Sequence, residues 1–110
     1  MNISQVPFTV TDWSQMEATE YKGESGTSFW WTFARGNLRV RIVEYSPGFR
    51  SDHWCPRGHV LYVLEGTLDI ELKDGRIFEL PAATGFQAED DDTNPHLASS
   101  VTGAKVFIVD

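Results

Sequence analysis

Strict alternation of apolar and polar residues is the feature that most constrains how this chain folds. Residues 38–42 alternate three apolar side chains with Arg39 and Arg41, and residues 67–72 alternate polar with apolar side chains in the same way. A period of two is typical of β-strands with one buried face. The sequence therefore predicts an antiparallel β-protein, and we expect the two arginines on the outward face, the alternative being that one buried arginine orients a carboxylate substrate.

Turn residues divide these strands at short intervals. The pair Asp74-Gly75 precedes a further strand at 76–80, which predicts a β-hairpin with a type I′ turn. Residues 60–64 form a continuous apolar run, which predicts a strand covered on both sides, and residues 106–109 form the last strand. No window of twelve residues carries an amphipathic helical stripe. We expect at most one short turn through residues 13–16, capped by Asp12.

Length and charge limit the classes of function. One hundred and ten residues make a single domain, and 9 basic against 16 acidic residues leave a net charge of −7. This balance argues against a nucleic acid or an anionic membrane as the partner, because both require an excess of basic residues. A single cysteine excludes an internal disulfide. The N-terminus lacks the pattern of a signal peptide and no apolar run has the length of a membrane span, so we expect a cytoplasmic protein.

Three histidines and the cysteine are the candidate metal ligands: His53, Cys55, His59 and His96. On a strand, the side chains of His53 and Cys55 project to the same face. Imidazole and thiolate suit Fe, Zn, Ni or Cu, and three protein ligands with open positions make a catalytic metal site. The alternatives are histidines at the surface or hydrogen-bonded in the core, and a cysteine that is only a small buried side chain.

The stretch from Gly48 to Gly66 resembles the first motif of the cupin superfamily, in which a glycine precedes His-x-His, a glutamate and a second glycine. His53 falls on the first histidine, Cys55 on the second and His59 on the glutamate, with a gap of four residues rather than five after Gly48. The run Tyr-Val-Leu-Glu-Gly at 62–66 is similar to the usual cupin sequence of the strand that follows the first histidines. This resemblance implies a single-domain jelly roll, the double-stranded β-helix.

The second cupin motif is matched more loosely. Gly75, the strand at 76–80 and the turn at 81–85 match its opening, His96 takes the place of its histidine after a longer acidic insertion, and Ser100 stands where asparagine is expected. Residues 38–110 thus resemble the barrel core, preceded by an N-terminal arm and strands at 1–37. The stretch Asp52-His-Trp-Cys55 resembles the small single-domain cupins named for a DHCW motif.

Two departures from the cupin pattern affect the implied ligand set. His59 replaces an anionic oxygen ligand, which makes the set similar to the all-histidine sites of some dioxygenase-type cupins. Cys55 either adds a thiolate or leaves three imidazoles. The resemblance implies His53, His59 and His96 as the core ligands, with Cys55 as a fourth, and a divalent transition metal whose identity stays open.

Three functions follow as hypotheses. The first is a metal-dependent oxygenase, isomerase or lyase acting on a small molecule inside the barrel. The second is a small-molecule or metal-sensing module without turnover, and the third is a structural cupin without metal. Tyr45 and Tyr62 are the candidate substrate-binding residues.

Two segments outside these motifs have open roles. The acidic stretch 89–92 is either a solvated loop or a guard at the cavity mouth that disfavours anions. The apolar segment 29–33 is expected to pack across a two-fold interface in a homodimer, the alternative being that its aromatic residues seal one end of their own barrel.

Overall fold

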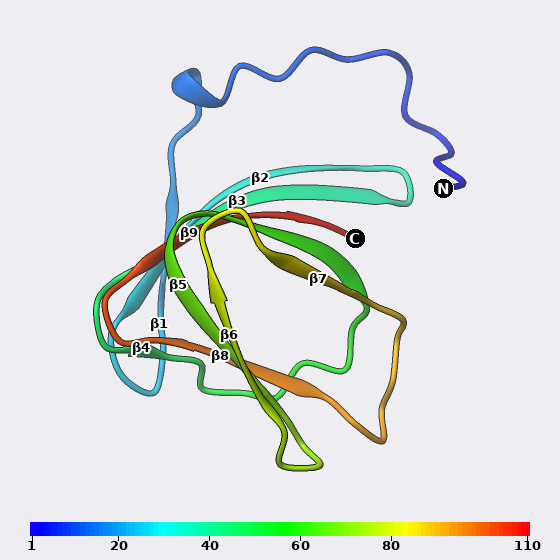
Figure 1. Ribbon diagram of the computed structural model, residues 1–110. Coiled ribbons are helices and arrows are strands. Elements are labelled where there is room, and N and C mark those ends of the chain that lie inside the picture. The colour runs from blue at the N-terminus through cyan, green and yellow to red at the C-terminus, as the bar shows by residue number, and fades with distance from the viewer.

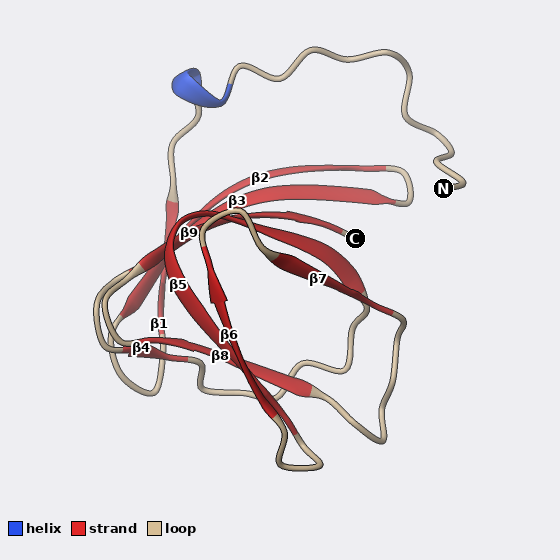
Figure 2. Cartoon of the chain, in the orientation of Figure 1, coloured by secondary structure: helices blue, strands red, loops and turns tan.

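A curled antiparallel β-sheet forms the body of the computed structural model, which describes residues 1–110, and an N-terminal arm without strands precedes it (Figure 1). Figure 2 shows that the single 3₁₀ turn stands apart from the strands. The elements are η1 (Trp13–Gln15), β1 (Thr19–Lys22), β2 (Thr27–Arg35), β3 (Leu38–Tyr45), β4 (Phe49–Arg50), β5 (His59–Leu72), β6 (Ile77–Pro81), β7 (Gly85–Ala88), β8 (His96–Ser100) and β9 (Ala104–Val109). None of the helical segments has the length and hydrophobicity needed to cross a membrane.

The long strand β5 connects the two halves of the barrel. The strand order is β1-β2-β3-β9-β5-β8-β4, with β6 and β7 also paired to β5. The first part of β5 pairs with β9 and β7, and its second part pairs with β6 and β8. Between these parts the pairing shifts, and Gly66 adopts a φ of 75°. A bulge with a left-handed residue turns the strand and so closes the barrel.

Side chains from both halves of β5 build the core. The fully enclosed cluster consists of Val43, Leu61, Val63, Leu68, Ile70, Ala104, Val106 and Ile108. Four of these residues lie along β5 on both sides of the Gly66 bend, and the others come from β3 and β9. The end of the barrel where β5 begins at His59 and β8 begins at His96 also receives polar side chains.

The arginines of β3 point into the barrel, so the expectation that they decorate the outward face is wrong. Arg41 is 5% exposed, and the inward residues along this strand are Arg39, Arg41, Val43 and Tyr45. The apolar residues that alternate with the arginines lie on the outside. Alternation identifies two faces of a strand but not which of them turns inward.

The run at 60–64 is also covered on one side only, against the prediction of cover on both. Val60 and Tyr62 are 48% and 46% exposed, whereas Leu61 and Val63 are buried. Together with neighbouring strands, these outward residues form what we call the outer apolar face. Its two cross-strand rows are Trp31-Ile42-Phe107-Tyr62 and Phe33-Val40-Val109-Val60.

The hairpin between β5 and β6 is confirmed, but its turn type differs from the prediction. Leu72 N–H donates to the Arg76 carbonyl, and Gly75 N–H donates to the Leu72 carbonyl, so three residues form the loop. Only Gly75 has a positive φ, whereas a type I′ turn requires two such residues. The short turn at Trp13 is confirmed as η1, with the Asp12 carboxylate accepting from Ser14 N–H.

Candidate metal centre and ligand chambers

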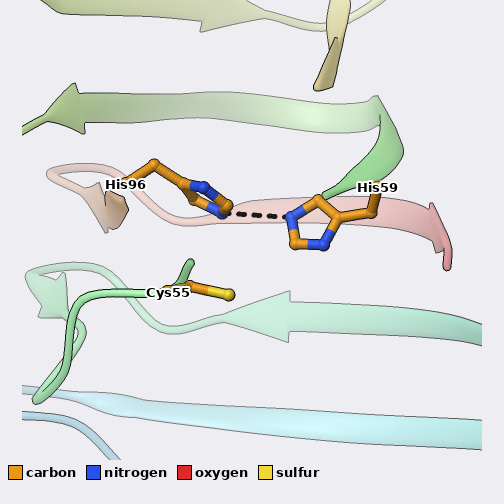
Figure 3. Close-up of side chains that lie close together, drawn as sticks. All are labelled: Cys55, His59 and His96. Atoms are coloured by element: carbon orange, nitrogen blue, oxygen red, sulfur yellow. Dashed lines mark hydrogen bonds between the residues drawn. The ribbon is translucent and has the colours of Figure 1, made fainter. Parts of the chain in front are cut away.

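Three ligand-type side chains converge at the polar end of the barrel. The Sγ of Cys55 and ring nitrogens of His59 and His96 all lie within 4.8 Å of one another. The Nε2 atoms of the two histidines are 3.0 Å apart, and Figure 3 shows the two rings, which are set nearly at right angles, with the thiol beside them. The three residues come from the loop after β4, the first residue of β5 and the first residue of β8.

Backbone hydrogen bonds hold Cys55 next to His96. The N–H of Cys55 donates to the His96 carbonyl at 2.7 Å, and the N–H of His96 donates to the Cys55 carbonyl at 2.9 Å. This isolated bridge sets two candidate ligands directly opposite one another. The thiol is free, and its only polar contact is the Arg57 carbonyl oxygen at 4.0 Å.

Burial keeps both imidazoles of the centre neutral at pH 7. Burial, followed by the neighbouring His96 imidazole and the charge of Arg41, lowers the pKa of His59 to about 4, although Asp110 opposes the shift. Burial also lowers the pKa of His96. Only a neutral imidazole has a lone pair for a metal, so these shifts favour metal binding.

Asp110 lies behind this centre, at the end of β9. Its Oδ2 is 3.5 Å from His59 Nδ1, which is too long for a good hydrogen bond, so the buried Nδ1 has no hydrogen-bond partner. Arg39 donates to both carboxylate oxygens at 2.9 and 2.8 Å, and Arg41 lies 3.4 Å away. Burial by itself raises the pKa of Asp110, but the hydrogen bond from Arg39 and the nearby arginine charges lower it overall.

A carboxylate near Nδ1 favours the tautomer with its proton on Nδ1, in which the lone pair of Nε2 is available to a metal. Metal-binding histidines commonly have such a partner on the far ring nitrogen. No spacing or alternation pattern in the sequence predicted this role of Asp110, which follows an apolar strand at 106–109.

His53 lies outside the group of three. Its side chain is 69% exposed, and its Nδ1–H donates to the Asp52 carboxylate at 2.8 Å. The segment around His53 and Cys55 is a loop rather than a strand, so the two side chains do not share a strand face. His53 contributes to the rim of a cavity that the centre also lines.

The two candidate tyrosines have different environments. Tyr45 lines the same cavity as His59, and burial raises its pKa to about 12. Tyr62 lies on the outer apolar face, because it alternates with the inward residues Leu61 and Val63. The structure thus brings Tyr45 to the site and places Tyr62 away from it.

Two cavities meet at the centre. The polar chamber, of about 590 Å³, is lined by Lys22, Arg39, Arg41, Arg57 and His59 among others, with Asp52 as its one carboxylate. The apolar pocket, of about 400 Å³, is lined mainly by residues of β5 to β7 and by Glu89 and Asp91. Cys55, Pro56, Ile70 and His96 line both.

The acidic stretch 89–92 therefore borders the apolar pocket rather than the polar chamber. Its backbone and side chains hold the loop that carries Cys55. Asp90 Oδ1 accepts from Gly58 N–H at 2.6 Å, and the Pro56 carbonyl accepts from Asp91 N–H at 2.9 Å.

The chemistry of the donors fits a divalent transition metal. Two nitrogens that each lie about 2.1 Å from one ion are separated by roughly 3.0 to 3.4 Å, and the Nε2 atoms of His59 and His96 are 3.0 Å apart. Neutral imidazole and a cysteine sulfur select Zn, Fe, Cu or Ni over Mg or Ca. Thus Cys55, His59 and His96 are suited to hold such an ion.

Known structures share the architecture of this chain. An RmlC-like cupin from Shewanella frigidimarina is 20% identical, with a TM-score of 0.74 over 96% of this chain and 91% of the other. A predicted oxalate decarboxylase from Thermotoga maritima is 13% identical, with a TM-score of 0.74 over 92% and 96%. The hydroxypropylphosphonic acid epoxidase from S. wedmorenis is 14% identical, with a TM-score of 0.70 over 94% of this chain and 59% of the epoxidase.

At these identities the similarity establishes a shared fold. No family model matches the chain, and no curated protein matches it.

Proposed function

Since this chain is a cupin-fold protein, we propose that it binds a divalent transition metal through Cys55, His59 and His96 and holds a small molecule in the barrel beside it. The observation that carries this proposal is the convergence of three donor atoms within 4.8 Å at the junction of two cavities. A bound metal would supply Lewis acidity toward the small molecule.

The surrounding residues prepare this site in distinct ways. The low pKa of His59 keeps its imidazole neutral, and the Asp110 carboxylate, 3.5 Å from Nδ1, favours the tautomer with its proton on Nδ1 and the lone pair on Nε2. Tyr45, with a pKa of about 12, stays protonated and can donate a hydrogen bond to the small molecule from the chamber wall. Leu61, Ile70 and Ile108 form an apolar part of that wall and limit water at the centre.

This arrangement supports metal-dependent chemistry on a small substrate, with oxygenase, isomerase and lyase reactions as the candidates. A binding or sensing module without turnover would use the same residues. The epoxidase and the predicted decarboxylase with similar folds give precedent for chemistry in such a barrel. Turnover of a substrate by the metal-loaded protein distinguishes the enzyme from the binder.

A structural role for the two histidines is favoured by one observation. The separation of 3.0 Å between their Nε2 atoms also suits a hydrogen bond in which one Nε2–H donates to the other ring. In that case the pair stabilises the polar end of the barrel without a metal.

Elemental analysis of protein purified without a histidine tag tests the proposal. We expect near-stoichiometric Fe, Zn, Ni or Cu in the wild type and loss of the metal in His59→Ala and His96→Ala. The matched control is His53→Ala, which removes an exposed imidazole outside the group of three. Protein that takes up no metal on reconstitution would overturn the proposal and support the structural role.

We further propose that a second copy of this chain covers the outer apolar face. Its two rows join four neighbouring strands, and its exposed members include Val60 and Tyr62. Contiguous apolar surface of this kind commonly marks an interface between proteins. The segment 29–33 contributes Trp31 and Phe33 to the face, whereas Trp30 points inward and lines the polar chamber.

A further inference from the structure

We propose that the polar chamber selects a small organic anion, whose carboxylate or phosphate group lies against Arg41 and Arg39 while its apolar part contacts the chamber wall. This inference rests on the proposed function, because it names the class of molecule held beside the metal. It is argued from the charge, burial and hydrogen bonding of the chamber's own side chains.

The charge of the chamber is opposite to that of the whole protein. Four of the nine basic residues of the chain line it, namely Lys22, Arg39, Arg41 and Arg57. The only carboxylate in the lining is that of Asp52, which already accepts a hydrogen bond from His53. A concave site lined by one sign of charge concentrates ligands of the opposite sign, here in a protein with a net charge of −7.

Asp110 does not neutralise this charge fully. Its single carboxylate faces the guanidinium groups of Arg39, Arg41 and Arg57 at 2.8, 3.4 and 3.7 Å. Arg39 uses both its Nε and Nη2 on this carboxylate, whereas Arg41 makes only one long contact. Three cations around one anion leave an excess of positive charge at the chamber wall.

Arg41 is a buried cation of the chamber wall with incomplete hydrogen bonding. Its side chain is 6% exposed, its Nε has no hydrogen-bond partner, and its guanidinium carbon lies 4.6 Å from the centre of the Trp30 ring. A buried guanidinium without full hydrogen bonding is costly. An anion in the chamber would supply the missing acceptors, since guanidinium geometry matches carboxylate and phosphate groups.

The rest of the chamber wall favours an apolar body on that anion. Trp30, Tyr45, Phe49 and Leu61 line the chamber together with the arginines. The apolar pocket on the other side of Cys55 and His96 has no cation in its lining and has Glu89 and Asp91 instead. The anionic group is therefore expected in the polar chamber only.

Binding of three aromatic probes to the full-length protein tests this inference: benzoate, phenyl phosphate and the neutral benzamide. We expect benzoate or phenyl phosphate to bind about tenfold or more tightly than benzamide by calorimetry, because a charged hydrogen bond is worth at least this factor. The stronger of the two anions identifies the head group. The indole N–H of Trp30, which donates to Ser28 Oγ at 2.9 Å, should shift in ¹H–¹⁵N spectra as the chamber fills.

Variants locate the site. Arg41→Gln should lose about tenfold in affinity for the anion and leave benzamide unchanged, whereas Arg76→Gln, at an exposed hairpin arginine, should behave as the wild type. The comparison of anion with benzamide in the wild type needs no variant, so it holds even if Arg41→Gln fails to fold. Equal affinities for benzoate, phenyl phosphate and benzamide, or full anion affinity in folded Arg41→Gln, would overturn the inference.

Metal-free and metal-loaded protein are both titrated, so that the two proposals fail separately. If the protein takes up no metal but still prefers the anions, and this preference depends on Arg41, this inference stands and the proposed metal function fails. Stoichiometric metal binding without any preference for the anions would support the proposed metal function and overturn this inference.

Discussion

The Nε2 atoms of His59 and His96 lie 3.0 Å apart, although 37 residues separate the two histidines. Each histidine is the first residue of its strand, and Cys55 is hydrogen-bonded through its backbone to His96. The pairing of these backbone segments therefore brings the Sγ of Cys55 and the ring nitrogens of His59 and His96 close together. The two rings can either share a proton in a hydrogen bond or bind one metal ion together.

Cobalt substitution tests whether the thiol of Cys55 binds the ion. We expect Co²⁺-loaded wild type to show a thiolate-to-cobalt charge-transfer band that disappears in Cys55→Ser, since the Sγ lies within 4.8 Å of both imidazole nitrogens. His53→Ala should keep the band, because its side chain is exposed and lies outside the group. The same band in wild type and Cys55→Ser would remove the cysteine from the ligand set.

Removal of the buried charge of Asp110 should destabilise the fold. In Asp110→Asn, the guanidinium groups of Arg39 and Arg41 lose their anionic partner while Arg41 stays buried, which costs about 3 kcal/mol in the free energy of unfolding. Urea denaturation measures this change. The control Asp74→Asn alters an exposed ion pair with Arg76 and should change the free energy of unfolding far less. Similar losses in both variants would contradict the central role of Asp110.

The phenol of Tyr45 should ionise only at high pH, and its ionisation should lower the free energy of unfolding. Its pKa is raised to about 12 by burial, above the ordinary value of 10, so the folded state favours the neutral phenol. The resulting contribution is fully present below pH 10 and is lost as the pH rises from 10 through 12. Relative to Tyr45→Phe, the wild type should lose roughly 2 to 3 kcal/mol over this range. Denaturant curves at each pH measure the difference, and parallel pH profiles would refute it.

Charge placed on the outer apolar face should separate the proposed dimer. Light scattering after size exclusion should give two chains for the wild type and one for Tyr62→Glu combined with Val60→Lys. Both side chains are about half exposed, so the substitutions should leave the monomer folded. Ile77→Glu, an exposed apolar residue on β6, is the control and should stay dimeric. A wild type that is monomeric at micromolar concentration ends the proposal.

Two glycines with similar backbone angles should respond differently to alanine. Gly66 has a φ of 75°, and an added Cβ would clash with the Gly103 carbonyl oxygen, so Gly66→Ala should cost about 3 kcal/mol or more. Gly48 has a φ of 79° with nothing within 4 Å, so Gly48→Ala should cost only the strain of about 1 to 2 kcal/mol. Thermal unfolding compares the two, and equal losses would mean that the β5 bend tolerates a side chain.

The sequence by itself determined the class of fold and the position of the hairpin. Alternation at 38–42 and 67–72, together with Asp74-Gly75, depends on local backbone geometry, which a short window of sequence expresses. The residues that form the group of three were also among the four candidates named from the sequence. Their number was small because the chain has only three histidines and one cysteine.

Only the tertiary structure decided which faces turn inward and which candidates meet. The outer face of β3 is apolar and its inner face carries Arg39 and Arg41, so hydrophobicity alone pointed to the wrong face. His53 lies in a loop whose path depends on distant contacts, and Asp110 reaches His59 through the pairing of β9 with β5. These relationships arise from the packing of strands far apart in the chain, which no local pattern of residues encodes.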